Sequence, residues 1–134
     1  MNPGGVMAHI LVIEDDTCLR KIICKILEKE GHQVFEAPNG NVAFKWIEKQ
    51  SLDLVITDIV MPEKEGIETI IQIRHEYPDL KVIAMSGCSE SSLYLSNAKA
   101  FGAEVVIKKP IEKDVLINVI KATIDSIDPV KSSS

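Results

Sequence analysis

The sequence lacks paired cysteines, long apolar runs and an excess of positive charge. Its three cysteines, Cys18, Cys24 and Cys88, are odd in number and form no C-x-x-C pair, so free thiols in a reducing cytoplasm are the simplest account. No apolar run approaches the ~18 residues of a membrane span, and no signal peptide is recognisable. The net charge of −5 argues against binding to a nucleic-acid backbone, which favours a basic surface.

The composition is that of one folded domain. The chain has 134 residues, of which 46% are hydrophobic and 26% are charged. This length is typical of a single domain with a core of its own. We expect a flexible leader at 1–7, a folded domain at 8–128 and a polar tail at 129–134.

Five short apolar stretches alternate with stretches of helical periodicity. The predicted strands are 8–13, 33–37, 54–58, 80–85 and 104–107. The first helix is marked by apolar residues on one predicted face, at Leu19, Ile22, Ile23, Ile26 and Leu27. The third is marked by Ile67, Ile70, Ile71 and Arg74. Asp16 or Thr17 can cap the first helix, and the fourth helix, about 89–101, has a thin apolar face that includes Phe101.

This alternation predicts the fold class. Strands that alternate with helices form parallel sheets with right-handed crossovers and helices on both faces. The second strand alternates polar and apolar residues, so it belongs at an edge, whereas the other strands are apolar throughout. We therefore predict an α/β, flavodoxin-like (βα)5 three-layer sandwich with the strand order 2-1-3-4-5.

Chemically active side chains stand at the carboxyl ends of four predicted strands. Glu14 and Asp15 follow the first, Asp58 ends the third, Ser86 ends the fourth and Lys109 follows the fifth. In the order 2-1-3-4-5 the first and third strands are neighbours at the switch point, where such sheets bind ligands. Each residue alone has an ordinary explanation as a turn, cap or surface residue, but the four strand ends together are much more specific.

Three clustered carboxylates predict a bound divalent cation. They repel one another, and an oxygen-only ligand set with room for water and phosphate oxygens suits Mg²⁺. Aspartate is also an established phosphoryl nucleophile. We therefore predict that Asp58 accepts a phosphoryl group, with a hydroxyl from Ser86 and a positive charge from Lys109 beside it.

With these residues in place, the sequence resembles the response-regulator receiver domain, the CheY-like family of two-component and phosphorelay signalling, over about residues 8–127. The motifs that carry the resemblance are residues 10–16 (ILVIEDD), 58–62 (DIVMP) followed by Gly66, 85–87 (MSG), and Lys109-Pro110.

The resemblance implies a role for each site residue. Glu14 and Asp15 would hold Mg²⁺ with Asp58, the phosphoacceptor, and the backbone carbonyl of Val60 would be a further metal ligand. Ser86 would be the switch hydroxyl and Lys109 the phosphoryl-contacting lysine. Family members often have a cis peptide bond before the proline that follows this lysine.

The resemblance also implies partners and one departure. The phosphoryl donor would be a histidine kinase or a histidine phosphotransfer protein, and phosphorylation would change the binding of a downstream protein. Such a domain is not an enzyme in the usual sense, although it catalyses its own phosphorylation and dephosphorylation. Its last strand and helix could form a homodimer. The family usually has an aromatic residue or histidine at the position of Val106, so signalling here would depend more on Ser86 and the loop after it.

Other interpretations remain open at this point. The domain could stand alone, act as a shuttle in a phosphorelay, or be part of a longer regulator with a DNA-binding output domain. A flavodoxin-like cofactor binder fits the fold but would need a phosphate-cradling loop after the first strand. A phosphatase with an aspartyl nucleophile would carry it on the first strand. His9, His32 and His75 show no metal or phosphotransfer spacing and are expected at the surface or at a strand edge.

Overall fold

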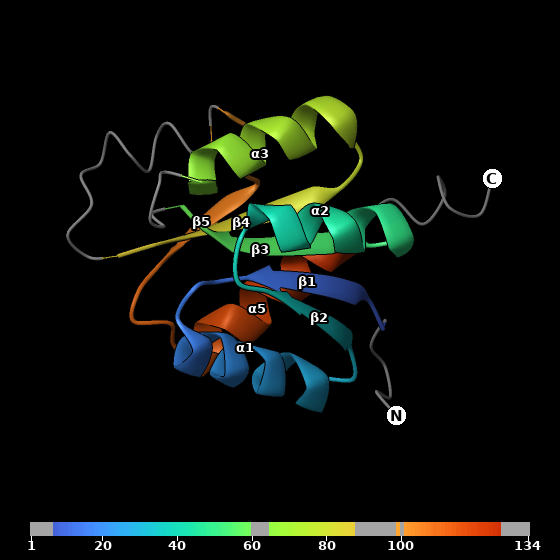
Figure 1. The fold of residues 1–134 in the computed structure, drawn as a ribbon. Coiled ribbons are helices and arrows are strands. Elements are labelled where there is room, and N and C mark those ends of the chain that lie inside the picture. Colours follow the sequence, from blue (N-terminus) through green and yellow to red (C-terminus); the bar gives the residue numbers. More distant parts are fainter. Residues whose placement is uncertain (1–6, 60–64, 88–98, 100, 127–134) are drawn as a thin grey trace.

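The computed structural model describes residues 7–59, 65–87, 99 and 101–126. In chain order its elements are β1 (His9–Ile13), α1 (Thr17–Lys29), β2 (Gln33–Ala37), α2 (Gly40–Lys49), β3 (Leu54–Asp58), α3 (Glu65–Glu76), β4 (Lys81–Ser86), β5 (Val105–Lys108) and α5 (Lys113–Asp125). All strand pairs are parallel, and the sheet order is β2-β1-β3-β4-β5 (Figure 1). The predicted topology is confirmed.

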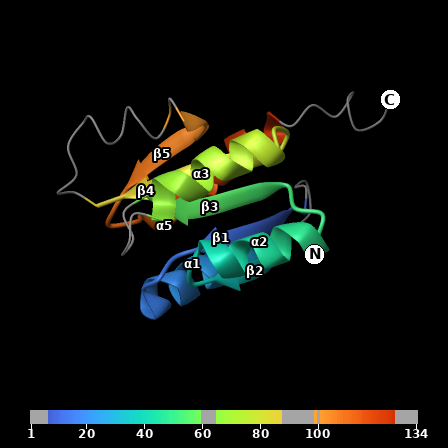
Figure 2. The same ribbon diagram turned by 45° about the horizontal axis from the view of Figure 1, so that its top comes forward.

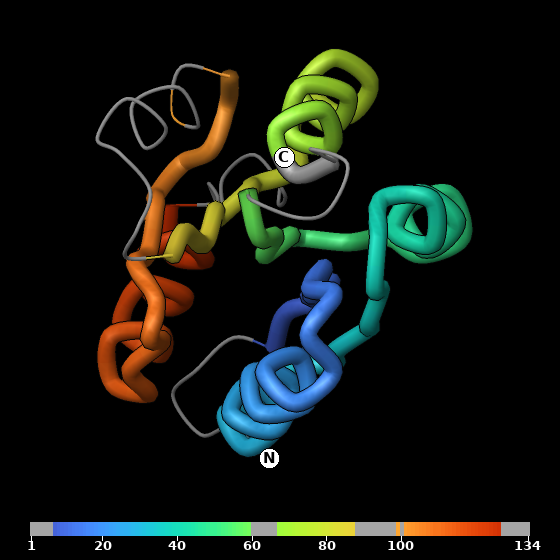
Figure 3. Tube along the Cα trace, turned by 60° about the vertical axis from the view of Figure 1, so that its left-hand side comes forward, coloured from blue at the N-terminus to red at the C-terminus, as the bar shows by residue number. Residues whose placement is uncertain are grey.

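The sheet lies between two layers of helices. Helices α2 and α3 cover one face, and α1 and α5 cover the other (Figures 2 and 3). Each face has its own hydrophobic cluster: Val55 and Ala84 belong to the cluster under α2 and α3, whereas Ile56 and Met85 belong to the other. Successive side chains of a strand point to opposite faces, so strands covered on both faces must be apolar throughout. This explains why β1, β3 and β4 are continuous apolar runs.

Two short polar side chains fix the starts of helices. The Asp16 carboxylate accepts a hydrogen bond from the backbone N–H of Leu19 at 3.2 Å, and Asn39 accepts one from Val42 at 3.0 Å. Both are N-caps, which satisfy backbone donors that have no partner within the helix. Asp16 rather than Thr17 is therefore the cap of α1, and it fixes the point where the chain turns away from the end of β1.

Some predicted core residues are exposed. Ile22 is 56% exposed on α1 and Ile71 is 43% exposed on α3, so both predictions were wrong. The buried face of a helix is narrower than its apolar residues suggest. On α1, for example, the buried residues are Ile23, Cys24 and Leu27. The predicted fourth helix lies mostly outside the described residues. Phe101, expected to anchor it, is 41% exposed.

The limits of the domain stay predictions. The leader expected at 1–7 and the tail expected at 129–134 lie outside the described residues, except for Met7. Within the part of the chain that the structure describes, none of the helices has the length and apolarity required to traverse a lipid bilayer.

Candidate functional site

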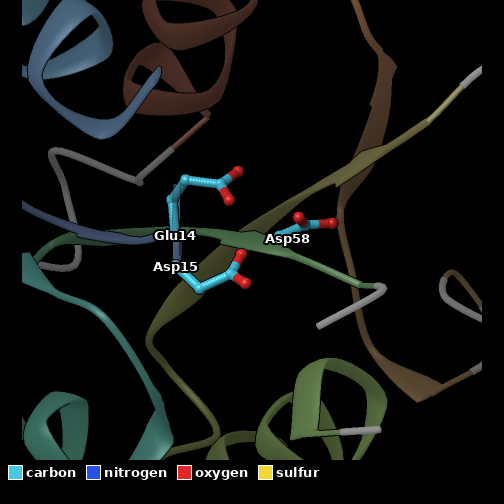
Figure 4. Close-up of side chains that lie close together, drawn as sticks. All are labelled: Glu14, Asp15 and Asp58. Atoms are coloured by element: carbon cyan, nitrogen blue, oxygen red, sulfur yellow. The ribbon is translucent and has the colours of Figure 1, made fainter. Parts of the chain in front are cut away.

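Neighbouring strands bring three carboxylates together. Residues Ile13 of β1 and Thr57 of β3 are paired in the sheet, so Glu14 and Asp15 after β1 lie beside Asp58 at the end of β3. Each of the three offers a carboxylate oxygen within 4.8 Å of the others, and their side chains converge in Figure 4. Glu14 and Asp58 are buried, and Asp15 is exposed. The three acids thus form one cluster with an opening to solvent.

A lysine bridges two of these acids. Lys109 Nζ donates to Glu14 Oε1 at 2.9 Å and to Asp58 Oδ2 at 2.7 Å. Alternation along the strand predicts that only one of the two consecutive lysines enters the site, and Lys108 is exposed. The Lys109–Pro110 peptide bond is cis, as the resemblance implies.

Burial and the bridging lysine set the charge balance of the site. Burial raises the pKa of Glu14 to about 7, against the opposing effects of the Asp16 backbone N–H and of Lys109; a hydrogen bond with Asp15 and the charge of Asp58 add to the rise. Burial alone would lower the pKa of Lys109, but its hydrogen bonds to Asp58 and Glu14 outweigh this and raise it. The lysine is therefore charged at neutral pH and offsets part of the repulsion between the acids.

Ser86 lies at the end of β4, the strand next to Asp58. It is fully buried, and its hydroxyl oxygen has no hydrogen-bond partner within the described part of the chain. The backbone N–H of Lys109 donates to the Ser86 carbonyl at 2.6 Å, which ties the two strand ends together. A buried hydroxyl without a partner is uncommon and calls for an explanation, such as a group that binds there.

Two other predicted positions contribute differently. Val60, whose carbonyl was expected to bind the metal, lies outside the described residues. Val106 is partly buried and packs against the cluster under α2 and α3. The position that is usually aromatic in the family thus carries an aliphatic side chain that packs against the core.

Sequence reasoning missed a residue that touches the acidic loop. Arg20 Nη1 donates to the backbone carbonyl of Glu14 at 2.6 Å, and its Nε donates to Glu36 Oε1 at 3.0 Å. An arginine on the first turns of a helix that follows an acidic loop was the available signal. The sequence did not show that its partners would be a carbonyl and a residue on β2.

The cluster fits a hard divalent cation. Its donors are carboxylate oxygens, which Mg²⁺ prefers, and no cysteine or histidine belongs to the group. The rise in the pKa of Glu14 indicates that uncompensated negative charge is costly here. A cation would offset this cost, so Glu14, Asp15 and Asp58 are the residues suited to hold it.

Comparison with known proteins assigns the family. The family model of the response regulator receiver domain matches residues 10–121. The chain belongs to this family. It is 35% identical over 121 residues to the chemotaxis protein CheY of Bacillus subtilis, a match that covers 89% of this chain and 100% of CheY. This receiver domain is therefore of the CheY-like type used in two-component and phosphorelay signalling.

Relatives of this receiver domain differ in length. It is 32% identical over 122 residues to the transcriptional regulator NtrC of Azospirillum brasilense, and the match covers 91% of this chain but 25% of NtrC. Among solved structures, the CheY-like receiver domain protein of Methanospirillum hungatei superimposes with a TM-score of 0.84 at 29% identity, over 91% of this chain and 97% of that one. The family's sites bind Mg²⁺ at an acidic pocket, and its members work with histidine kinases and downstream effectors. The flavodoxin-like cofactor binder and the aspartyl phosphatase are thereby disfavoured.

Proposed function

We propose that this receiver domain is phosphorylated on Asp58 by a phosphohistidine donor and that the modification regulates the binding of a downstream protein. The observation that carries the proposal is the contact of Lys109 Nζ with both Asp58 and Glu14, inside a cluster of three carboxylates. Each residue at a strand end then has a role. Glu14, Asp15 and Asp58 hold the metal, Lys109 and Ser86 contact the phosphoryl group, and the backbone carbonyl of Val60 completes the metal ligands.

The transfer is a displacement at phosphorus. A carboxylate oxygen of Asp58 attacks the phosphorus atom of the donor, a P–O bond forms, the P–N bond to the donor histidine breaks, and the freed imidazole nitrogen retains the electron pair and takes up a proton. Bound Mg²⁺ supplies positive charge that offsets the charge on the phosphoryl oxygens. Lys109 stays within reach of that charge, and the Ser86 hydroxyl can donate to a phosphoryl oxygen. Hydrolysis of the acyl phosphate returns Asp58 and inorganic phosphate.

The signal follows from the added charge. A phosphoryl group adds about −1.5 to −2 charges at a place where one lysine offsets only part of the charge of three carboxylates. We expect the response in Ser86, which ends the strand paired with that of Asp58, and in the loop after it. The aliphatic Val106 replaces the usual aromatic switch, so the response depends mainly on Ser86. This chemistry defines the phosphoryl donor as a histidine kinase or a histidine phosphotransfer protein. It defines the downstream partner only as a protein whose binding changes on phosphorylation.

The domain's setting is also part of the proposal. We propose a cytoplasmic receiver folded over about residues 8–128, either free-standing or part of a longer regulator, with a homodimer through its last strand and helix as an available assembly. A receiver within a longer regulator performs the same chemistry at Asp58. The length of the gene distinguishes these two settings.

The decisive experiment is intact mass spectrometry after incubation with acetyl phosphate and Mg²⁺. Wild type and Asp125→Asn, which alters an exposed aspartate of α5, should gain the mass of one phosphoryl group. Asp58→Asn should gain none, and wild type in EDTA should gain none. A phosphoryl gain by Asp58→Asn would show that the acceptor is elsewhere. No gain by wild type from acetyl phosphate or from phosphorylated histidine kinases would favour a phosphorylation-independent binding module.

A further inference from the structure

A partly buried arginine joins the acidic loop to the neighbouring edge strand. Arg20 lies in α1, and its side chain is 12% exposed. Nη1 donates to the Glu14 carbonyl at 2.6 Å, and Nε donates to Glu36 Oε1 on β2 at 3.0 Å. A guanidinium presents several donors in one rigid plane, so two contacts of this kind fix its orientation.

The acceptor on β2 is itself held in place. Lys21 Nζ donates to Glu36 Oε2 at 2.9 Å, so both carboxylate oxygens have cationic partners. Partial burial alone would raise the pKa of Glu36, but the hydrogen bonds from Lys21 and Arg20 outweigh it and lower the pKa. The backbone carbonyl of Glu36 accepts a hydrogen bond from Trp46 Nε1 at 2.9 Å. Glu36 therefore gives the Arg20 guanidinium an acceptor whose position is fixed.

The carbonyl that Arg20 contacts belongs to the peptide between two candidate metal ligands. The N–H of Glu14 already donates to the Ala37 carbonyl at 3.0 Å, which continues the pairing of β1 with β2. Arg20 fixes the other end of the residue through its carbonyl. With both backbone groups held, the directions in which the Glu14 and Asp15 side chains leave the chain are set.

We infer that Arg20 is a positioning residue for the divalent-cation site, which orients the Glu14–Asp15 peptide and thereby sets the affinity of the site for Mg²⁺. The inference rests on the proposed function, because it assumes that Glu14 and Asp15 bind the cation. Residues outside the ligand shell that orient ligands typically change metal affinity by about 10- to 100-fold when they are altered.

The sign of the effect separates positioning from simple charge. Arg20 is a cation close to the site, and its removal makes the local potential more negative. By Coulomb attraction alone, Arg20→Gln would bind Mg²⁺ more tightly. If Arg20 acts by orienting the loop, the same change weakens binding.

The test is calorimetric titration of the full chain with Mg²⁺. Arg20→Gln should raise the dissociation constant by about 10-fold or more. Lys21→Gln is the matched control, because it removes the same charge and a bond to Glu36 but is 58% exposed and makes no bond to Glu14 among the contacts that the structure describes. Its affinity should stay within about twofold of wild type, since exposed charges are screened by salt. Arg20→Lys keeps the charge but not the planar fork, and it should also weaken binding.

Three results would overturn the inference while leaving the proposed function intact. These are tighter binding by Arg20→Gln, equal affinities in Arg20→Gln and Lys21→Gln, or wild-type affinity in Arg20→Lys. Circular dichroism in EDTA reports whether each variant is folded. If Arg20→Gln does not fold, Arg20→Lys carries the test, because it keeps the positive charge and removes only the planar fork; it should weaken binding, and unchanged affinity would count against positioning. An absence of Mg²⁺ binding by wild type would instead refute the proposed metal site.

Discussion

Lys109 reaches across a whole strand to contact Asp58. Its Nζ lies 2.7 Å from Asp58 Oδ2, although Lys109 follows β5, Asp58 ends β3, and β4 lies between these strands. Two strand spacings amount to roughly 10 Å. Because the aspartate side chain is short, only a long side chain such as lysine can span the remaining distance. The length and charge of lysine at this position are therefore both used in the site.

Removal of this lysine should destabilise the metal-free protein. Lys109→Gln leaves the buried Glu14 and Asp58 carboxylates without their common cation. We expect a loss of about 1–3 kcal/mol in the free energy of unfolding in EDTA, less than for a fully buried pair because Lys109 is partly exposed. Urea unfolding measures this change. Millimolar Mg²⁺ should reduce the loss, because a bound cation replaces some of the missing charge.

The neighbouring lysine provides the control for this prediction. Lys108→Gln makes the same change in net charge at an exposed position. Its free energy of unfolding should stay within about 0.5 kcal/mol of wild type. Equal effects of the two substitutions would mean that net charge, rather than the contact with Asp58, accounts for the loss.

Ser86→Ala should separate folding from signalling. The Ser86 hydroxyl is buried without a hydrogen-bond partner among the described residues, so its removal should leave the unphosphorylated protein as stable as wild type or more stable by about 1 kcal/mol. The variant should still accept a phosphoryl group on Asp58. Its amide exchange over residues 81–87 and 101–108 should change less on phosphorylation than that of wild type.

The comparison uses hydrogen exchange before and after acetyl phosphate, at equal extents of phosphorylation. Ser51→Ala, an exposed serine in the turn before β3, is the control and should respond as wild type does. A wild-type response from Ser86→Ala would remove the hydroxyl from the switch.

Arg74→Gln should loosen the end of α3 and the start of β5 together. The Arg74 guanidinium donates to the backbone carbonyls of Pro78, Leu80 and Gly102, at 2.6, 3.0 and 3.0 Å. Gly102 has φ +128, a conformation that favours glycine, and a Cβ on it would lie 2.8 Å from Arg74 Nε, so a side chain there would displace Arg74. With three acceptors losing their donor, we expect a loss of about 1–3 kcal/mol.

The measurement for this prediction is urea unfolding combined with hydrogen exchange. Exchange should accelerate at residues 78–82 and 101–105 in the variant. Lys99→Gln, an exposed cation near the same turn, should alter neither quantity. Unchanged stability in Arg74→Gln would show that water satisfies these carbonyls equally well.

These arginines mark the limit of what the sequence predicted. The alternation of strands and helices fixes which strand ends meet, so the convergence of Glu14, Asp15 and Asp58 followed from the order 2-1-3-4-5. Arg20 contacts the carbonyl of Glu14, six residues away, and a carboxylate on β2. Arg74 contacts carbonyls four, six and 28 residues away. A long side chain can reach many such acceptors, and no residue pattern distinguishes them.

Burial was harder to predict than topology for the same kind of reason. Ile22 and Ile71 are apolar and lie beside buried neighbours on their helices, yet they are exposed. Apolar character shows that a side chain can be buried. The position of the helix on the sheet determines which of its apolar side chains are covered. His32 was expected at the surface or at a strand edge, and it is buried where the chain enters the edge strand β2.

His32 should make stability depend on pH in a defined direction. Its ring is buried and its Nδ1 accepts a hydrogen bond from the backbone N–H of Ala8 at 3.1 Å, which requires an unprotonated nitrogen. Burial lowers its pKa, partly opposed by Glu30. Below the unfolded-state pKa of about 6.5, the unfolded chain binds a proton that the folded chain resists. Stability is therefore complete above that pH and falls as pH decreases towards the lowered folded-state pKa.

Urea unfolding of wild type and His32→Asn between pH 7.5 and 5.5 tests this linkage. Asn offers an acceptor oxygen for the Ala8 N–H without a titrating group, so the stability of wild type relative to this variant should decrease as the pH falls. Both proteins contain Glu14 and the other acids, so the effect of these groups cancels in the difference between the two free energies of unfolding. His75→Asn, at an exposed position on α3, should parallel wild type throughout. Parallel curves for wild type and His32→Asn would mean that the buried ring accepts a proton in the folded state as readily as in the unfolded chain, and that the contact with Ala8 does not hold it neutral.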